Sequence, residues 1–144
     1  MISMSKKILL VDDDLYIREL YEDILQEEGY EVETTADGKE ALEKILENSY
    51  DLILLDIMLP KLDGIGLITK LKETGSKVSL KSIVFLTNLA HDPVVKEALA
   101  SGVHSCLVKS DITPDQLIKH VKHVLGNGEK IKAAKPSSQV GEDL

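Results

Sequence analysis

The sequence predicts an α/β fold in which a doubly wound parallel sheet is covered by helices on both faces. Strand patterns and helix patterns alternate along the chain, with five of each. The strand that ends at Asp56 is an unbroken apolar run, which is typical of a strand buried on both faces. Strands that alternate with helices form a parallel sheet with right-handed crossovers, which place helices on both faces.

The first half of the chain contains two strand-helix pairs. Residues 8–11 form a short apolar strand, and the apolar residues that follow recur at helical spacing until Gly29. Residues 30–34 are the second predicted strand. Asp37 and Gly38 then begin a second helix with capping chemistry and an apolar inner face.

The middle of the chain contains the central strand and a third helix. The strand spans residues 50–56, and the pair Asp63 and Gly64 provides the turn and the cap of the helix that follows. A polar connection covers residues 76–81, and residues 82–86 form the fourth predicted strand.

The last third repeats the order of helix, strand and helix. The fourth helix begins at Asp92, ends at Gly102 and has only a thin apolar face. Residues 103–108 are the fifth predicted strand. Thr113 starts a capping box with proline inside it, and Gly126 ends the last helix.

Composition limits the kind of protein. Residues 1–126 form one predicted domain, and residues 127–144 form a predicted disordered tail with almost no apolar anchor. The net charge of -8 argues against direct nucleic-acid binding. The single cysteine, Cys106, excludes an internal disulfide and fits a reducing compartment. The sequence contains no signal-peptide core and no apolar run of membrane-spanning length, so we expect no membrane insertion and a cytoplasmic location.

Polar side chains follow four of the predicted strands. Asp12 and Asp13 follow the first, Asp56 ends the third, Thr87 follows the fourth and Lys109 follows the fifth. The ends of parallel strands open on one side of a sheet, where α/β proteins bind ligands. Two carboxylates about 4 Å apart repel by roughly 4 kcal/mol at an effective dielectric constant of 20. The cluster therefore predicts a bound cation. Oxygen ligands without His or Cys select a hard ion, and the small number of protein ligands, which leaves positions for water and phosphate, favours Mg²⁺ over Ca²⁺.

These groups suggest phosphoryl chemistry. A carboxylate beside Mg²⁺ can attack phosphorus and form an acyl phosphate, which gives Asp56 the role of nucleophile. Thr87 and Lys109 would bind the oxygens of the transferred group. The alternative for the aspartates after the first strand is that they cap the first helix, and we expect this task of Asp14.

The sequence resembles the receiver domains of two-component response regulators. The resemblance covers residues 6–126 and depends on VDDD at 11–14, LLDIMLPKLDG at 54–64, LT at 86–87 and VK at 108–109. It implies a flavodoxin-like (βα)5 sheet with strand order 2-1-3-4-5, which is a property of that family.

The resemblance also implies the roles of individual residues. Asp56 corresponds to the phosphoacceptor, and Asp13, Asp56 and the backbone carbonyl of Met58 to direct ligands of Mg²⁺. Asp12 corresponds to an outer ligand that acts through water. Thr87 and Lys109 correspond to the phosphate-sensing pair.

The implied function is that of a phosphoryl-accepting signalling protein. A sensor histidine kinase or a histidine phosphotransfer protein donates the phosphoryl group from a phosphohistidine, and the phosphorylated receiver changes its contacts with a downstream protein target. We expect no external substrate. We expect the protein to catalyse its own phosphorylation and a slow autodephosphorylation. The second reaction should be slow because Met58 and Leu89 are apolar at positions that flank the path of the hydrolytic water in receivers.

Three positions depart from the usual receiver pattern. Ser110 replaces a proline after the sensing lysine, and Asn88 replaces a small residue after the sensing threonine. The aromatic residue that often switches conformation is replaced by Cys106. A cysteine has no ring to rotate. Two outcomes are open: the fourth helix shifts on phosphorylation, or the switch is weak.

Three other functions are alternatives for this sequence. A degenerate receiver would act only as a protein-interaction module. A phosphatase of the haloacid dehalogenase type needs a second acid two residues after the nucleophile, where this chain has Met58. A flavodoxin-like cofactor binder needs a phosphate-binding loop after the first strand, and the aspartates there would repel phosphate.

Overall fold

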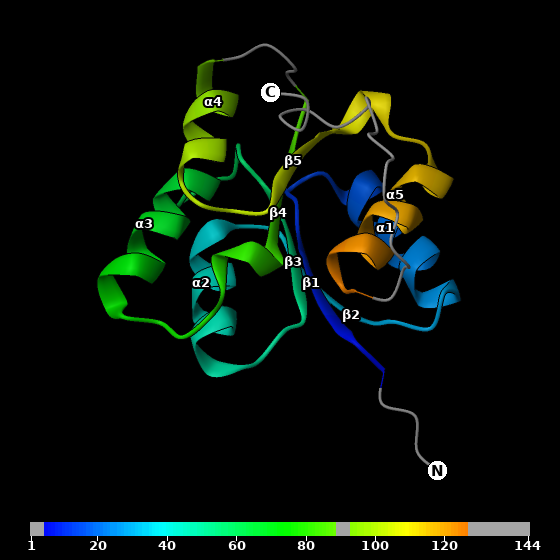
Figure 1. Ribbon diagram of the computed structural model, residues 1–144, viewed down its shortest axis with the longest axis horizontal. Coiled ribbons are helices and arrows are strands. Elements are labelled where there is room, and N and C mark those ends of the chain that lie inside the picture. Colours follow the sequence, from blue (N-terminus) through cyan, green and yellow to red (C-terminus); the bar gives the residue numbers. More distant parts are fainter. Residues whose placement is uncertain (1–4, 89–92, 127–144) are drawn as a thin grey trace.

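The computed structural model describes residues 5–88 and 93–126. Five parallel strands form one sheet in the order β2-β1-β3-β4-β5 (Figure 1). The strands are β1 (Lys7–Val11), β2 (Glu31–Thr35), β3 (Leu52–Asp56), β4 (Ile83–Thr87) and β5 (Ser105–Val108). The flavodoxin-like class and the strand order are therefore confirmed.

Two layers of helices cover the sheet. The helices are α1 (Leu15–Glu27), α2 (Gly38–Glu47), α3 (Gly64–Thr74), α4 (Pro93–Ala100) and α5 (Pro114–Val124). α1 and α5 lie on one face, and α2, α3 and α4 lie on the other (Figure 1). Each face has its own apolar core. No helix within the described ranges has the length and the apolar composition needed to cross a bilayer.

The sheet has a fully buried centre and a charged edge. All five residues of β3 are buried, as the apolar run predicts for a strand with neighbours on both sides. Among the strands that the structure describes, β2 lies at the edge of the sheet and pairs only with β1. Glu31 of this strand is exposed, while Glu33 accepts a hydrogen bond from the Tyr50 hydroxyl at 2.6 Å and pairs with Lys7 at 3.3 Å.

Capping side chains begin the helices as the sequence predicts. Asp14, Asp37 and Asp63 each accept a backbone N–H bond in the first turn of α1, α2 and α3. Thr113 and Gln116 form the complete capping box of α5. The cap predicted at Asp92 lies outside the described residues, as does the predicted tail.

Several predicted strand boundaries are wrong by one or two residues. β1 begins at Lys7 instead of residue 8, β2 covers Glu31–Thr35 instead of 30–34, and β3 begins at Leu52 instead of residue 50. The polar connection predicted at residues 76–81 ends in a short 3-10 helix, Leu80–Ser82, capped by Ser79, so β4 begins at Ile83 instead of residue 82. The fifth strand begins at Ser105 instead of residue 103. Just before this strand, the His104 N–H donates a hydrogen bond to the Ile83 carbonyl at 2.9 Å, and the regular pairing of β5 with β4 begins at Ser105.

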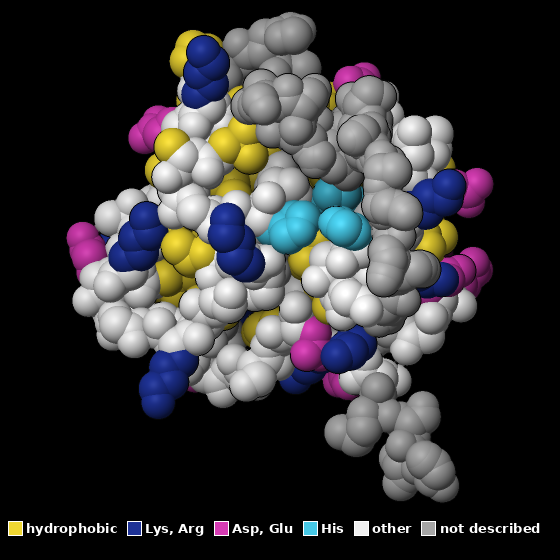
Figure 2. All heavy atoms as spheres, in the orientation of Figure 1, with side chains coloured by type: hydrophobic (Ala, Val, Ile, Leu, Met, Phe, Trp, Pro, Cys, Tyr) yellow, Lys and Arg dark blue, Asp and Glu magenta, His cyan; other side chains and the backbone are white. Residues whose placement is uncertain are grey.

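Three histidines gather where β5 meets α5, and Figure 2 shows a patch of histidine side chains on one face of the molecule. The ring centroids of His104, His120 and His123 are 5.7 to 6.4 Å apart. The Ser105 hydroxyl lies 2.9 Å from His104 Nδ1 and 2.8 Å from His120 Nε2. Burial, assisted by the charges of His104 and His123, lowers the pKa of His120 to about 4.

Because His120 is buried, we expect the protein to lose stability in mild acid. The pKa of His120 rises on unfolding toward the ordinary value of 6.5. The stability of the fold that depends on a neutral His120 is therefore fully present above pH 6.5 and is lost as the pH falls toward 4. The expected loss at pH 5 is about 2 kcal/mol. Denaturant unfolding at pH 7.5 and pH 5 should show a larger drop for wild type than for His120→Gln. Equal drops in the two proteins would contradict the prediction.

Candidate functional site

Four strands place the predicted polar residues at their carboxyl ends, which lie together at one end of the sheet. Asp12 follows β1, and Asp56 is the last residue of β3. Asp56 is in register with Leu86, so Thr87 lies one position further along the neighbouring strand. Lys109 follows β5 directly. Each side chain is therefore positioned by the end of a rigid strand.

Three carboxylates form the centre of this edge. Asp12, Asp13 and Asp56 each offer an oxygen atom, and these oxygens lie within 4.8 Å of one another. Asp12 and Asp56 are buried, whereas Asp13 is exposed. Within the described ranges this is the one close group of three or more acidic, histidine or cysteine ligands. Carboxylate oxygens without nitrogen or sulfur ligands suit a hard cation such as Mg²⁺.

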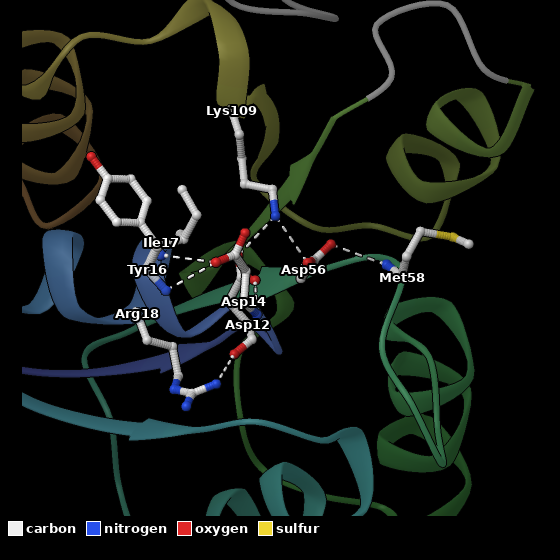
Figure 3. A network of polar contacts seen from close by, with 8 residues as sticks. All are labelled: Asp12, Asp14, Tyr16, Ile17, Arg18, Asp56, Met58 and Lys109. Carbon is white, nitrogen blue, oxygen red and sulfur yellow. Dashed lines mark hydrogen bonds and ion pairs between the residues drawn. The ribbon is translucent and has the colours of Figure 1, made fainter.

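Lys109 compensates the charge of the two buried acids (Figure 3). Its Nζ lies 2.8 Å from Asp12 Oδ2 and 3.0 Å from Asp56 Oδ2, and its side chain is only 5% exposed. Burial alone would lower the pKa of Lys109, but the hydrogen bonds and charges of the two acids outweigh it and raise this pKa. The amine is therefore a cation that bridges Asp12 and Asp56.

The Asp56 carboxyl is held in an unfavourable environment for its charge. Burial raises its pKa, and the charge of Asp12 raises it further. Lys109 and the Met58 N–H act in the opposite direction, and the resulting pKa is about 6. Asp56 is thus mainly ionised at pH 7, and additional positive charge beside it would stabilise the ionised form.

The loop after β1 divides its three aspartates between two tasks. Asp14 Oδ1 accepts the N–H groups of Tyr16 at 2.9 Å and Ile17 at 3.4 Å, so it caps α1. Asp12 accepts the Asp14 N–H at 2.9 Å. The capping alternative therefore applies to Asp14, as predicted, and does not account for Asp12 or Asp13.

Arg18 is a supporting residue that sequence reasoning missed. Its guanidinium donates a hydrogen bond from Nη1 to the backbone carbonyl of Asp12 at 2.8 Å (Figure 3). This contact fixes the loop that carries the acids. Nothing in the sequence distinguishes Arg18 from any other polar residue of an amphipathic helix.

Met58 contributes its backbone to the site. Its N–H donates to Asp56 Oδ1 at 3.1 Å, while its side chain is 64% exposed and points away from Asp56 (Figure 3). Leu89, the other apolar position expected beside the hydrolytic water, lies outside the described residues. Thr87 is buried at the end of β4.

Cys106 lies in the core and away from the acids. It is fully buried on the face of the sheet that carries α4, in the same apolar cluster as Val95 and Ala98. Burial raises the pKa of its thiol to about 12, so the group stays protonated. The two outcomes predicted for this position, a shift of α4 and a weak switch, stay predictions.

Sequence comparisons agree on one family. The profile described as "Response regulator receiver domain" matches residues 8–122. The chain is 38% identical over 134 residues to "Transcriptional regulatory protein CpxR homolog" of Haemophilus influenzae, covering 93% of this chain and 54% of that protein. It is 38% identical over 122 residues to "Transcriptional regulatory protein SrrA" of Staphylococcus aureus, covering 85% and 48%. The chain thus spans about half the length of these relatives.

Solved structures show the same fold. The chemotaxis protein CheY4 of Vibrio cholerae is 33% identical with a TM-score of 0.75, covering 84% of this chain and 99% of that one. The receiver domain of sensor histidine kinase PA1611 from Pseudomonas aeruginosa PAO1 is 27% identical with a TM-score of 0.76, covering 85% and 99%. That structure has a magnesium ion coordinated in its active-site cleft.

Proposed function

Because the chain belongs to the response regulator receiver domain family, we propose that it accepts a phosphoryl group on Asp56 in a reaction that depends on Mg²⁺. The donor is a phosphohistidine of a sensor histidine kinase or a histidine phosphotransfer protein. The observation that carries the proposal is the buried Asp56 carboxylate, which lies close to two further acids and bonds to Lys109. The output is a change in contacts with a downstream protein.

The acids and one backbone group would hold the metal. Asp13, Asp56 and the carbonyl of Met58 are the proposed direct ligands, and Asp12 is the proposed outer ligand through water. The close oxygen atoms of the three carboxylates support this assignment, as does the magnesium ion in the PA1611 receiver. When bound, Mg²⁺ neutralises charge on the acids and on the phosphoryl oxygens.

The chain's own residues provide the remaining chemistry. A carboxylate oxygen of Asp56 forms the new O–P bond while the N–P bond of the phosphohistidine breaks. The electron pair of that bond stays on the imidazole, which takes up one proton and leaves as a neutral ring. Lys109 and the Thr87 hydroxyl bind oxygens of the transferred group, as charge-assisted and neutral hydrogen-bond donors.

Exposed apolar side chains near the acids favour a protein donor. Leu15 and Tyr16 begin α1 next to the aspartate loop, and Met58 follows Asp56; all three are more than half exposed. Apolar side chains that surround a polar site are typical of a surface that binds another protein. A small phosphate donor alone would need none of them.

Intact mass tests the proposal directly. Incubation with Mg²⁺ and acetyl phosphate should add one phosphoryl group, and removal of the metal with EDTA should prevent this. A degenerate receiver would show no mass change under either condition. A phosphatase of the haloacid dehalogenase type would hydrolyse the donor without retaining the label, but the exposed thioether of Met58 cannot protonate a leaving group.

The lifetime of the phosphoryl group gives a second expectation. The side chain of Met58 has no group that orients a water molecule, so Met58→Asn should shorten the lifetime by roughly tenfold, which corresponds to about 1.4 kcal/mol in the barrier. Combining it with a polar residue in place of Leu89 should shorten it further. The decay of the intact-mass signal after removal of the donor measures the rate.

Met58→Leu is the matched control, because it changes the side chain and keeps it apolar. Its phosphoryl lifetime should equal that of wild type. The idea is wrong if the Asn and Leu variants lose the phosphoryl group at the same rate.

A further inference from the structure

The loop between β3 and α3 contains a tight turn. The Leu62 N–H donates to the Pro60 carbonyl at 2.7 Å, across a single intervening residue. That residue, Lys61, has a φ of 68°, the one positive value among the non-glycine residues that the structure describes. Such a conformation is strained and persists where surrounding contacts enforce it.

The first turn of α2 supplies contacts that hold this turn. The Gly38 N–H donates to the Pro60 carbonyl at 3.3 Å. Lys61 Nζ lies 3.7 Å from Asp37 Oδ2, and Asp37 is also the N-cap of α2. The cap residue Asp37 therefore contacts Lys61, and Gly38, the first residue of α2, contacts Pro60.

The other end of the loop is fixed beside the acid site. The Ile57 N–H donates to the Leu86 carbonyl at 3.0 Å, and the Gly64 N–H donates to the Ile57 carbonyl at 2.8 Å. Met58, which donates to Asp56, lies between this anchored residue and Pro60. A displacement of the turn must therefore be absorbed by the short segment that contains Met58.

The close approach of α2 leaves no space for a side chain at residue 38. A Cβ atom there would lie 1.6 Å from the carbonyl oxygen of Leu62 and 2.7 Å from its carbonyl carbon. Both are backbone atoms, so no rotamer change can relieve the overlap. The conformation of Gly38 lies outside the positive-φ region, so the requirement for glycine here is one of space.

We propose that Gly38 is a positioning residue for the acid site: its missing side chain lets α2 hold the turn at residues 60–62, and this support aligns the backbone of Met58 with Asp56. The inference builds on the proposed function in one respect, the role of the Met58 carbonyl as a metal ligand. Within the part of the chain that the structure describes, α2 contributes no side chain to the acid cluster, and the contacts of Gly38 and of its cap Asp37 reach the loop that carries Met58.

Gly38→Ala and Gly66→Ala form a matched pair of variants that test the proposal. Both add one methyl group against Leu62, but a Cβ at residue 66 would lie 3.0 Å from Leu62 Cδ1, the flexible end of the side chain. Mg²⁺ titrations followed by amide NMR should show roughly tenfold weaker binding for Gly38→Ala, a typical effect of residues that orient metal ligands. Gly66→Ala should bind Mg²⁺ as wild type does.

A second readout separates positioning from stability and from the proposed function. In metal-free protein, Gly38→Ala should shift the amide resonance of Met58, which reports its bond to Asp56. This signal requires no phosphorylation and no metal, so it tests the positioning even if wild type takes up neither. An unchanged Met58 resonance together with unchanged Mg²⁺ affinity would overturn the proposal, whatever the change in unfolding free energy.

Lys61→Gly keeps the test decisive if Gly38→Ala fails to fold. It removes the ion pair to Asp37 and relaxes the positive-φ position without adding an atom. We expect its Mg²⁺ affinity to fall severalfold and the Met58 amide to shift. An affinity within about twofold of wild type, which is less than about 0.5 kcal/mol, would overturn the proposal.

Discussion

Asp56→Asn is expected to take up no phosphoryl group under conditions in which wild type takes up one. The Asn amide is a poor nucleophile, while Asp12 and Asp13, which keep their carboxylates, belong to a different loop. Intact mass after incubation with Mg²⁺ and acetyl phosphate measures the uptake. The expected effect is complete loss, the largest that any single substitution in this chain should produce.

Asp51→Asn is the control for this experiment. Asp51 is exposed just before β3, at the opposite end of the strand, and its carboxylate accepts the Lys7 N–H at 2.7 Å. It should be labelled as completely as wild type. If Asp56→Asn were labelled as fully as Asp51→Asn, the nucleophile would be a different residue.

Asp56→Asn should also stabilise the metal-free protein. The pKa of Asp56 is about 6 in the folded state, above the ordinary 3.8, so the carboxyl reduces stability as the pH rises from 3.8 to 6. At pH 7 the ionised group costs on the order of 3 kcal/mol, which Asn does not incur. A gain in unfolding free energy with a loss of labelling would show that the chain retains this acid for its chemistry.

Lys109→Met is expected to destabilise the metal-free protein by about 3 kcal/mol. The substitution leaves Asp12 and Asp56 buried without the amine that bridges them, and removing one member of a buried ion pair has costs of this size. Denaturant unfolding in EDTA measures the loss. Adding Mg²⁺ should recover more stability in this variant than in wild type, because a cation then replaces the missing charge.

Lys122→Met provides the comparison for this prediction. Lys122 pairs with Glu28 at 3.1 Å, but its side chain is 43% exposed. Exposed ion pairs contribute less than about 1 kcal/mol, so this variant should unfold nearly as wild type does, and Mg²⁺ should affect both alike. Similar losses in the two variants, or no added effect of Mg²⁺ on Lys109→Met, would contradict the role assigned to Lys109.

The fold could be predicted because its signals are local and repeated. The apolar run of β3 identifies a strand buried on both faces, and the caps at Asp14, Asp37 and Thr113 identify helix starts. Once the strands are known to be parallel, their carboxyl ends must share one edge. The sequence therefore indicates that Asp12, Asp56 and Lys109 lie near one another before any coordinate is known.

Contacts between distant backbone segments could not be predicted in this way. Nothing in the pattern around Gly38 shows that a carbonyl 24 positions later, that of Leu62, approaches it. The bond of Arg18 to the Asp12 carbonyl is similar, because any polar residue on that helix face looks alike in sequence. Val103 is another example. It is buried, as an apolar strand residue would be, but it lies two positions before the first residue of β5.

The charged edge strand β2 affects how the molecules behave toward one another. No strand of the described ranges pairs with its outer side, whose backbone groups could pair with a strand of a second sheet. Glu31 and Glu33 flank Val32 along this edge, so two copies that paired through β2 would bring like charges together. The two glutamates should therefore oppose edge-to-edge growth into aggregates.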